Sequence, residues 1–339
     1  MKVFEGKTIM FGVPKLFNLD SMIEAELKAV GLNTFNISVH NNTFKYTNNR
    51  QRLESLLDKI RTGKSNYKQL LNFRESASRI LAEIENVVQV DYILIIRPEI
   101  YPYDFLGSLK KKGKKMIGYQ WNGLKRFPQT LNYIPLFDKF YVFDSVDLNT
   151  PNVFPTTNFY PTTIPNENIA EKTDAYYTGS YIRKRMPTLC DLISKFEALD
   201  LNVHYHLFAK RKKYFFPCRI TTSRKTVSYE QNIQNTYNTD ILLDITVAEH
   251  EGLSFRILEA VGFERKLITT NPRVHDYDFY HPDNILIWTS QSKEELAEFL
   301  RKPYVAIPER IKWKYSFKNW IQYMLDYGDY IPIELPPAK

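Results

Sequence analysis

Short apolar runs alternate with stretches of helical periodicity along the first half of the chain. Apolar runs bounded by Gly, Pro or charged residues predict strands, and leucines at i, i+3, i+4, i+7 spacing predict helices. The strands expected are Lys7–Phe11, Thr34–Val39, Tyr92–Ile96, Lys115–Tyr119 and Asp138–Phe143. The helices expected are Met22–Val30 (Ser21 and Glu24 have capping-box spacing), much of residues 50–90, and Phe105–Lys112. This alternation predicts a parallel sheet with helices on both faces.

The same alternation begins again after a proline-rich connection. Residues 150–174 carry prolines at positions 151, 155, 161 and 165 among Thr and Asn, which is typical of a link between domains. Beyond it, the strands expected are Asp174–Thr178, Val203–Phe208, Asp240–Asp244 and Lys266–Thr270, and the helices are Met186–Leu199 and Phe255–Val261. An aromatic tail from Trp313 to Tyr323 predicts a terminal helix. The fold class expected is α/β, with two successive parallel-sheet domains.

Composition narrows the class of protein. The 339 residues are 43% hydrophobic and 14% aromatic, which excludes disorder of the whole chain and indicates a sizeable core. The 12 glycines include no two that are two residues apart, so no G-x-G-x-x-G dinucleotide fingerprint is present, and no P-loop is found either. No stretch approaches the ~18 apolar residues of a membrane span. The two cysteines, Cys190 and Cys218, are too few for a disulfide framework or a zinc site, which favours a reducing cytoplasm.

The net charge of +8 favours an anionic partner. A nucleic acid is disfavoured as that partner, because the charges are spread through α/β sequence and no nucleic-acid-binding module is recognised.

Residues 240–271, "DILLDITVAEHEGLSFRILEAVGFERKLITTN", carry the most chemistry. They predict a strand, a polar loop, a helix and another strand. Ser254 is a good N-cap, and the positive end of the helix that follows it is suited to phosphate, with Arg256 beside it. Glu251 precedes this helix and Glu259 lies within it, with seven residues between them.

Glu251 through Glu259 resembles the E-x7-E pattern of GT-B glycosyltransferases, and "EGLSFRILEAVG…KLITTN" is similar to the longer signature of that family. Three further segments look like bacterial enzymes of lipopolysaccharide, O-antigen or capsule assembly, similar to glycosyltransferase family 4/1-like enzymes. These segments are "FDKFYVFDSVD", "YYTGSYIRKR" and "KLITTNPRVHDYDFYHPDNI". The resemblance is strongest over residues 135–290 and only architectural over residues 1–130.

The resemblance implies a GT-B fold, with two Rossmann-like domains facing a cleft and a terminal helix that packs back on the N-terminal domain. The domains expected are 1–160 on the acceptor side, 161–312 for the nucleotide sugar, and 313–339 as the returning helix and tail. The nucleotide sugar would be a substrate, and neither a cofactor nor a metal is expected.

The resemblance also assigns roles to residues of the motif. Glu259 would accept hydrogen bonds from the ribose hydroxyls, Glu251 would face the donor sugar, and Ser254, Phe255 and Arg256 would hold the phosphates. The chain departs from the family pattern at Gly252, where a proline is usual, at Ser254, where a glycine is usual, and near Lys266, where a proline is usual. These departures weaken the inference of a retaining mechanism more than that of the fold.

A second group of candidates follows the first strand of the second half. Gly179 and Ser180 would allow close backbone approach, and Arg183, Lys184 and Arg185 would bind donor phosphates, to which arginine is well suited. The alternative, a basic helix start in solvent, stays open for each single residue. The basic run Lys210–Lys213 is interpreted as a solvated turn.

In the first half, Gly12, Pro14 and Lys15 follow the first strand, and Trp121 and Asn122 follow another. The resemblance puts them on the acceptor side of the cleft. No catalytic base is assigned, although Asp144 and Asp147 are nearby carboxylates. Lys110, Lys111, Lys112, Lys114 and Lys115 form either an anionic-membrane contact or a solvated face.

Three further patterns are interpreted as structural. Asp276-Tyr277-Asp278 is a D-x-D in the wrong place for a metal site, His204 and His206 have no third ligand at zinc spacing, and His281-Pro282 lacks the residues that would confirm a sialyltransferase pair.

The function expected is transfer of a sugar from a nucleotide sugar to a growing bacterial surface glycan, with retention, in the cytoplasm or at the inner face of its membrane. Two alternatives stay open, a CMP-Kdo-type transferase on the same fold and a non-catalytic GT-B-like subunit that binds a glycan or a partner.

Overall fold

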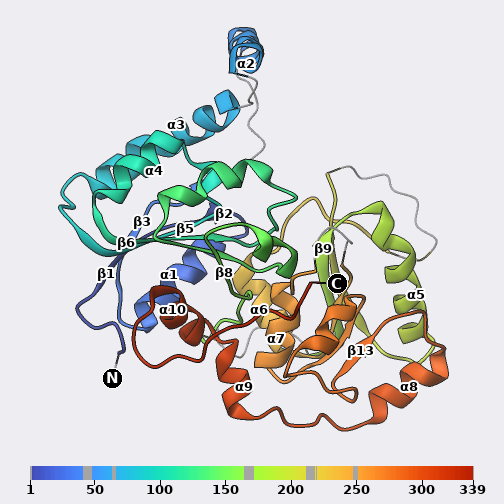
Figure 1. Ribbon diagram of the computed structural model, residues 1–339. Helices are drawn as coiled ribbons and strands as arrows, with labels where there is room; N and C mark the ends of the chain where they lie inside the picture. Colours follow the sequence, from blue (N-terminus) through green and yellow to red (C-terminus); the bar gives the residue numbers. More distant parts are fainter. Residues whose placement is uncertain are drawn as a thin grey trace. The chain divides into compact units, whose positions relative to one another are not determined.

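The computed structural model describes residues 2–40, 48–62, 66–163, 172–210, 218, 220–246 and 251–338. They form two compact units (Figure 1). Unit 1 comprises Met1–Val142 and Asp147–Phe154, and unit 2 comprises Phe143–Val146 and Pro155–Lys339. The predicted limits at residues 160 and 312, and the cleft between domains, stay predictions.

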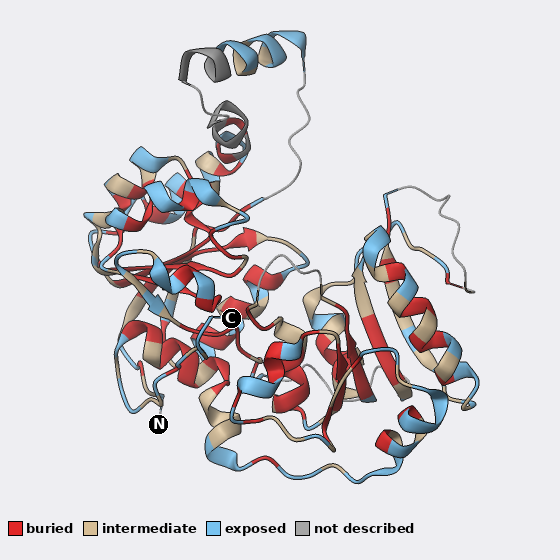
Figure 2. Cartoon of the chain, turned by 45° about the vertical axis from the view of Figure 1, so that its right-hand side comes forward, coloured by how far each residue is buried: buried red, intermediate tan, exposed pale blue. Residues whose placement is uncertain are grey.

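Unit 1 is built on a six-stranded sheet with the order β3-β1-β5-β6-β7-β8, in which the pairs from β3 to β7 are parallel. Its strands are β1 (Thr8–Gly12), β3 (Asn33–Asn36), β5 (Val90–Ile96), β6 (Gly113–Gln120), β7 (Lys139–Val142) and β8 (Val153–Pro155). Its helices are α1 (Leu19–Ala29), α2 (Asn49–Thr62), α3 (Asn66–Ile84) and α4 (Tyr103–Lys110). Its short 3₁₀ turns are η1 (Pro98–Ile100), η2 (Pro128–Asn132) and η3 (Ile134–Leu136), and a further turn, η4 (Ser145–Asn149), begins in the unit 2 segment Phe143–Val146 and ends in unit 1. The central strands β1, β5, β6 and β7 are largely buried, whereas the edge strands β3 and β8 are partly exposed and the helices expose their outer faces (Figure 2).

Two local predictions in unit 1 are wrong. Helix α1 begins at Leu19 and follows Asn18, which has a left-handed backbone, so Ser21 lies inside the helix and does not cap it. The predicted strand Thr34–Val39 ends at Asn36, and the chain then forms β4 (Val39–His40), which pairs with β2 (Pro14–Lys15) in a separate two-stranded sheet. The pairing of β2 with β4 is not visible in a hydrophobic pattern because each strand has only two residues.

Unit 2 is built on a five-stranded parallel sheet with the order β10-β9-β11-β12-β13. Its strands are β9 (Thr173–Ser180), β10 (Val203–Phe208), β11 (Thr239–Asp244), β12 (Lys266–Thr269) and β13 (Ile285–Ile287). Its helices are α5 (Met186–Glu197), α6 (Tyr229–Tyr237), α7 (Phe255–Gly262), α8 (Lys293–Arg301), α9 (Glu309–Lys314) and α10 (Phe317–Leu325), and its short 3₁₀ turns are η5 (Arg183–Arg185) and η6 (Pro272–Asp276). Two parallel sheets covered by helices confirm the prediction of two Rossmann-like halves. Helix α6, strand β13 and helix α8 were not predicted from the sequence.

The aromatic tail forms a helix, as predicted. On α10, the Trp320 indole is fully buried, donates to the Thr157 carbonyl over 3.1 Å and lies 4.6 Å from the Phe159 ring, centroid to centroid. The Tyr160 amide donates to the Tyr315 carbonyl, and the Phe317 amide donates to the Tyr160 carbonyl. The tail therefore covers residues 155–160, which belong to the same unit. Its predicted return to the N-terminal domain stays a prediction.

Cys190, on α5, is joined to Cys218 by a disulfide. This bond was not expected, and it removes the support that two reduced thiols gave to a reducing compartment. Among the described residues, no helix has the length and apolar content of a membrane span.

Candidate functional site

The order of strands in unit 2 points to a candidate ligand site at the carboxyl ends of β9 and β11. From β9 the chain continues to β10 on one side of the sheet, whereas from β11 it continues to β12 on the other side. Neighbouring strands whose connections leave in opposite directions open a crevice at their carboxyl ends, where α/β proteins bind ligands. Ser180 ends β9 and Asp244 ends β11, so the candidate site lies where the sequence analysis placed the donor.

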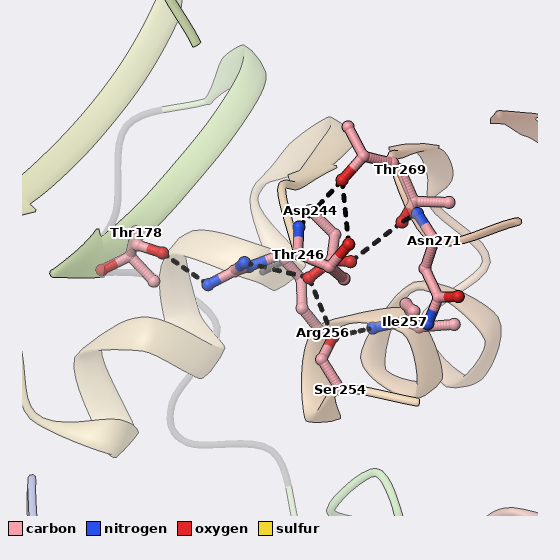
Figure 3. Close-up of polar contacts among 9 residues, drawn as sticks. Thr178, Asp244, Thr246, Ser254, Arg256, Ile257, Thr269 and Asn271 are labelled. Atoms are coloured by element: carbon pink, nitrogen blue, oxygen red, sulfur yellow. Dashed lines mark hydrogen bonds and ion pairs between the residues drawn. The ribbon is translucent and has the colours of Figure 1, made fainter. Parts of the chain in front are cut away.

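Asp244 holds this edge together (Figure 3). Its side chain is buried and accepts hydrogen bonds from the Ser254 hydroxyl and from the Thr269 hydroxyl, each over 2.9 Å. The Arg256 guanidinium completes the set, with its Nη1 3.4 Å from the same oxygen that accepts from Ser254. One carboxylate thus links the end of β11 to β12 and to the first turn of α7.

Arg256 bridges the two strands of the switch point. Its Nη2 donates to the Thr178 carbonyl on β9, its Nη1 pairs with Asp244 at the end of β11, and its guanidinium carbon lies 5.6 Å from the centre of the Tyr177 ring (Figure 3). The side chain is 18% exposed. Both Nη atoms are therefore engaged by protein, and the predicted contact of Arg256 with phosphate stays a prediction.

Ser254 caps α7, as predicted. Its hydroxyl accepts from the Ile257 amide over 3.4 Å and donates to Asp244. The E-x7-E pattern that this segment resembles usually has glycine at this position, and a glycine could make neither bond. Ser254 therefore ties the first turn of α7 to Asp244 at the end of β11. The positive end of α7 lies at the same sheet edge as Arg256.

Glu259 lies within α7 and is fully buried. Its Oε1 accepts a hydrogen bond from the Tyr229 hydroxyl of α6 over 2.7 Å. Burial raises the pKa of Glu259 above its usual range, while the Tyr229 hydroxyl, the Arg256 charge and Asn232 oppose that shift. A carboxylate that already accepts a hydroxyl is chemically suited to accept the hydroxyls of a sugar.

Glu251, the other glutamate of the pair, is held in place from two sides. Its carboxylate lies 3.2 Å from Nε of the buried Arg273 and accepts from the Ser145 hydroxyl over 3.4 Å. Its backbone amide donates to Asp144. Arg273 also pairs with Asp276 and donates to the Pro337 carbonyl. Glu251 is thus oriented by an ion pair, and its role toward a donor sugar stays a prediction. Residues 247–250 of the same segment lie outside the described residues.

Gly252 stands where the E-x7-E pattern usually has proline, and its surroundings leave no room for a side chain. This close packing predicts how a substitution at Gly252 changes stability. A Cβ at this position would lie 2.5 Å from two ring carbons of Phe143 and 2.7 Å from the Phe143 carbonyl oxygen. We expect Gly252→Ala to destabilise unit 2 by about 1–3 kcal/mol, because a Cβ overpacks the space, and to lower the melting temperature in calorimetry. Gly107→Ala is the matched control, because a Cβ there meets nothing within 4 Å. Equal melting temperatures for the two variants would contradict the steric explanation.

The basic loop after β9 lies at the same edge. Gly179 and Ser180 end β9, and Arg183 and Lys184 are exposed in η5. Arg185 is half-buried, and its Nε is enclosed without a hydrogen-bond partner among the residues that the structure describes. The loop follows Thr178, whose carbonyl accepts from Arg256, so the structure brings both predicted groups of unit 2 together at one sheet edge.

The candidates of unit 1 lie at the carboxyl edge of its own sheet. Gly12 ends β1, Pro14 and Lys15 form β2, and Trp121 and Asn122 follow β6. Trp121 is buried, and Lys15 forms an ion pair with Asp20 over 3.6 Å. Their acceptor role stays a prediction.

The patterns interpreted as structural have local partners. Asp276 pairs with Arg273, and Asp278 accepts from the Tyr315 hydroxyl over 2.6 Å and from Lys314 over 3.0 Å. His206 bonds to the Lys225 carbonyl, and His281 Nδ1 accepts from the Asp283 amide. No group of three His, Cys, Asp or Glu suited to a metal occurs within the part of the chain that the structure describes.

Three lysines of the basic cluster form ion pairs or hydrogen bonds within unit 1. Lys110 pairs with Asp138, Lys114 pairs with Asp91, and Lys112 donates to the Val87 carbonyl. Of the run Lys210–Lys213, only Lys210 is among the described residues.

Three residues that organise the site were not among the candidates from sequence. Asp244 was seen only as the end of a strand, Tyr229 lies on the missed helix α6, and Arg273 follows the η6 proline. The signal for α6 was Ser228 with Gln231 three residues later, and the Ser228 hydroxyl indeed accepts from the Gln231 amide.

No family model and no curated protein matches the sequence. Solved structures are similar over most of the chain. The apo form of the lipopolysaccharide outer core galactosyltransferase WaaB is 13% identical, with 93% of this chain and 98% of that chain covered and a TM-score of 0.43. Sucrose-phosphate synthase from Thermosynechococcus elongatus is 10% identical, with 87% and 89% covered and a TM-score of 0.47. Glycosyltransferase VinC in complex with dTDP is 11% identical, with 94% and 95% covered and a TM-score of 0.44.

Proposed function

We propose that the chain is a GT-B glycosyltransferase that moves a sugar from a nucleotide-sugar donor to an acceptor glycan. The observation that carries the proposal is Glu259, a fully buried carboxylate on the helix that starts at the switch point of unit 2. Burying a carboxylate is unfavourable unless hydrogen bonds or a partner compensate it. This carboxylate already accepts from the Tyr229 hydroxyl, so the hydroxyls of a nucleotide ribose fit its chemistry.

The rest of the edge supports phosphate binding. The positive end of α7 and the exposed Arg183 and Lys184 supply charge on either side of the switch point. During transfer, the bond between the sugar and the phosphate breaks and negative charge grows on the leaving phosphate. Cationic groups fixed at that position stabilise the developing charge.

Glu251 is the group proposed to face the donor sugar. Arg273 and Ser145 fix its orientation, which favours positioning of the sugar over proton transfer. Retention of the anomeric configuration belongs to the same proposal, and its support is the spacing of Glu251 and Glu259.

The acceptor proposed is a growing bacterial surface glycan, such as lipopolysaccharide, O-antigen or capsule. The sequence segments around residues 135–290 support it. A place at the inner face of the cytoplasmic membrane is part of this proposal, and its support is the net charge of +8. No metal is assigned a role in the reaction.

A thermal-shift panel of UDP, GDP, ADP, CMP and their sugars tests the donor site. We expect one nucleotide to raise the melting temperature by several degrees, because a ligand at about 100 times its Kd adds roughly 2.7 kcal/mol to stability. A preference for CMP would favour the CMP-Kdo-type alternative. A flat panel with folded protein would favour a non-catalytic subunit and overturn the proposal.

Anomeric-proton NMR of the product then tests the stereochemical course. The donor named by the panel is incubated with the protein and a saccharide acceptor, and a retained configuration is expected. An inverted product would leave the transferase proposal standing and remove retention from it.

A further inference from the structure

Unit 1 has its own switch point, between β1 and β5. From β1 the chain continues to β3 on one side of the sheet, and from β5 it continues to β6 on the other. The first residue after β5 is Arg97, which has a left-handed backbone with φ of 61°. This conformation is uncommon for a residue other than glycine, and such strain collects at functional sites. The bond from the Arg97 amide to the Tyr119 carbonyl, 2.8 Å long, ties the strained residue to β6.

The Arg97 side chain is only 9% exposed, and its orientation is fixed. Nε donates to Glu99 over 2.7 Å, and the guanidinium carbon lies 4.2 Å from the centre of the Phe127 ring. The second oxygen of Glu99 accepts from Gln120 and from Thr130. The ion pair is thus held on both sides, and the guanidinium cannot turn away from the position that Glu99 and Phe127 give it.

The bond to Glu99 uses Nε of Arg97 and neither of its two Nη atoms. Neither has a hydrogen-bond partner among the described residues, and neither is among their fully enclosed, unpartnered polar atoms. They therefore reach the surface at the carboxyl edge of the sheet. Two Nη donors in a fixed plane match the two oxygens of a carboxylate or a phosphate.

Charge at this edge also favours an anion. Glu99 balances the charge of Arg97, but the exposed Lys125 and Arg126 follow on the loop after β6. The Arg126 guanidinium carbon lies 5.7 Å from the Phe127 ring that also carries Arg97. Two arginines thus gather around one ring, one buried and oriented, the other exposed.

We propose that the carboxyl edge of the unit 1 sheet binds an anionic group through the Nη atoms of Arg97. Under the proposed function, on which this role rests, that group belongs to the acceptor, so the acceptor is an acidic saccharide or a phosphorylated one. Binding of the anion itself does not depend on glycosyl transfer. Arg97 is then the residue that selects charged over neutral acceptors.

NMR of the ¹⁵N-labelled arginine side chains tests the proposal in the whole chain. The Nε–Hε resonance of Arg97 is assigned by its absence in Arg97→Lys. Wild-type protein without nucleotide is titrated with glucuronate, with inorganic pyrophosphate and with glucose as the neutral control. We expect the Arg97 resonance to shift with glucuronate, with pyrophosphate or with both, and not with glucose. A shift with glucuronate alone identifies a carboxylate ligand, and a shift with pyrophosphate alone identifies a phosphate.

The Kd of the bound anion supplies the second readout. We expect Arg97→Gln to raise it about tenfold or more, because a charge-assisted pair of hydrogen bonds is lost. Arg52→Gln, an exposed position on α2, is the matched control and should leave that Kd unchanged. If Arg97→Gln does not fold, the wild-type resonance decides. No shift with either anion, or a folded Arg97→Gln with the wild-type Kd, overturns the proposal. The anion titration contains no nucleotide, so its failure would overturn only the Arg97 site. A flat thermal-shift panel with nucleotides would overturn only the proposed glycosyltransferase function.

Discussion

Replacing Glu259 with glutamine is expected to remove most of the affinity of the protein for its nucleotide and to leave unit 2 folded. The amide has nearly the shape of the carboxylate but no negative charge, so it accepts the ribose hydroxyls less strongly. Hydrogen bonds to a charged group are worth about 1.5–3 kcal/mol each, so the Kd should rise about 10- to 100-fold. Isothermal titration with the nucleotide that stabilises the wild-type protein measures this change.

The same substitution should change the pH dependence of stability. Burial raises the pKa of Glu259 in the folded state above its value in the unfolded chain. Between these two values the folded state binds more protons, so stability is greatest at low pH and declines as the pH rises through the raised pKa. In Glu259→Gln this decline should disappear, and at neutral pH the variant should be at least as stable as the wild type. Chemical denaturation across that pH range is the measurement.

Tyr229→Phe separates the hydrogen bond between Glu259 and Tyr229 from the proposed binding of the ribose by Glu259. This variant keeps Glu259 but removes the hydroxyl that now donates to Oε1. We expect it to bind the nucleotide at least as tightly as the wild type, because Oε1 is then left for a ribose hydroxyl. If Glu259→Gln binds with the wild-type Kd, the carboxylate has no part in nucleotide recognition.

The order of strands and helices could be predicted from sequence because it depends on local patterns. Apolar runs such as Tyr92–Ile96 have few alternatives to a buried strand, and Ser254 before an amphipathic segment marks a helix start. Helix α6 was missed since its residues are mainly polar, with Ile233 its main apolar anchor in the core. Strand β13, Ile285–Ile287, was missed although it is an apolar run, because three residues are too few to tell a strand from a buried loop.

The partners of the site residues could not be predicted, because they come from distant parts of the chain. Arg256 reaches Thr178, Glu259 accepts from Tyr229, and Glu251 pairs with Arg273. Each pair depends on how strands and helices are placed beside one another, which a local pattern does not contain. Arg97 was missed for a related reason, since its left-handed backbone and its contact with Phe127 exist only in the folded unit.

Asp244→Ala should give the largest loss of stability in unit 2. The substitution removes the acceptor of the Ser254 and Thr269 hydroxyls and the ion-pair partner of Arg256. Removing one member of a buried, hydrogen-bonded ion pair typically destabilises a protein by about 3–5 kcal/mol, because the remaining charge is left without compensation. For a domain of this size, that loss lowers the melting temperature by roughly 10 °C, which calorimetry resolves.

A double-mutant cycle distinguishes the loss of the Asp244–Arg256 ion pair from the loss of the acceptor for the Ser254 and Thr269 hydroxyls. Asp244→Asn keeps the shape and part of the hydrogen bonding, so its destabilisation should be smaller than that of Asp244→Ala. Arg256→Gln removes the cation alone. We expect the double variant Asp244→Asn, Arg256→Gln to be more stable than the sum of the single effects predicts, by about 1–2 kcal/mol, because no unpaired charge remains. Strict additivity would mean that Arg256 is not stabilised by Asp244, and that its guanidinium is held at the switch point by the Thr178 carbonyl and the Tyr177 ring instead.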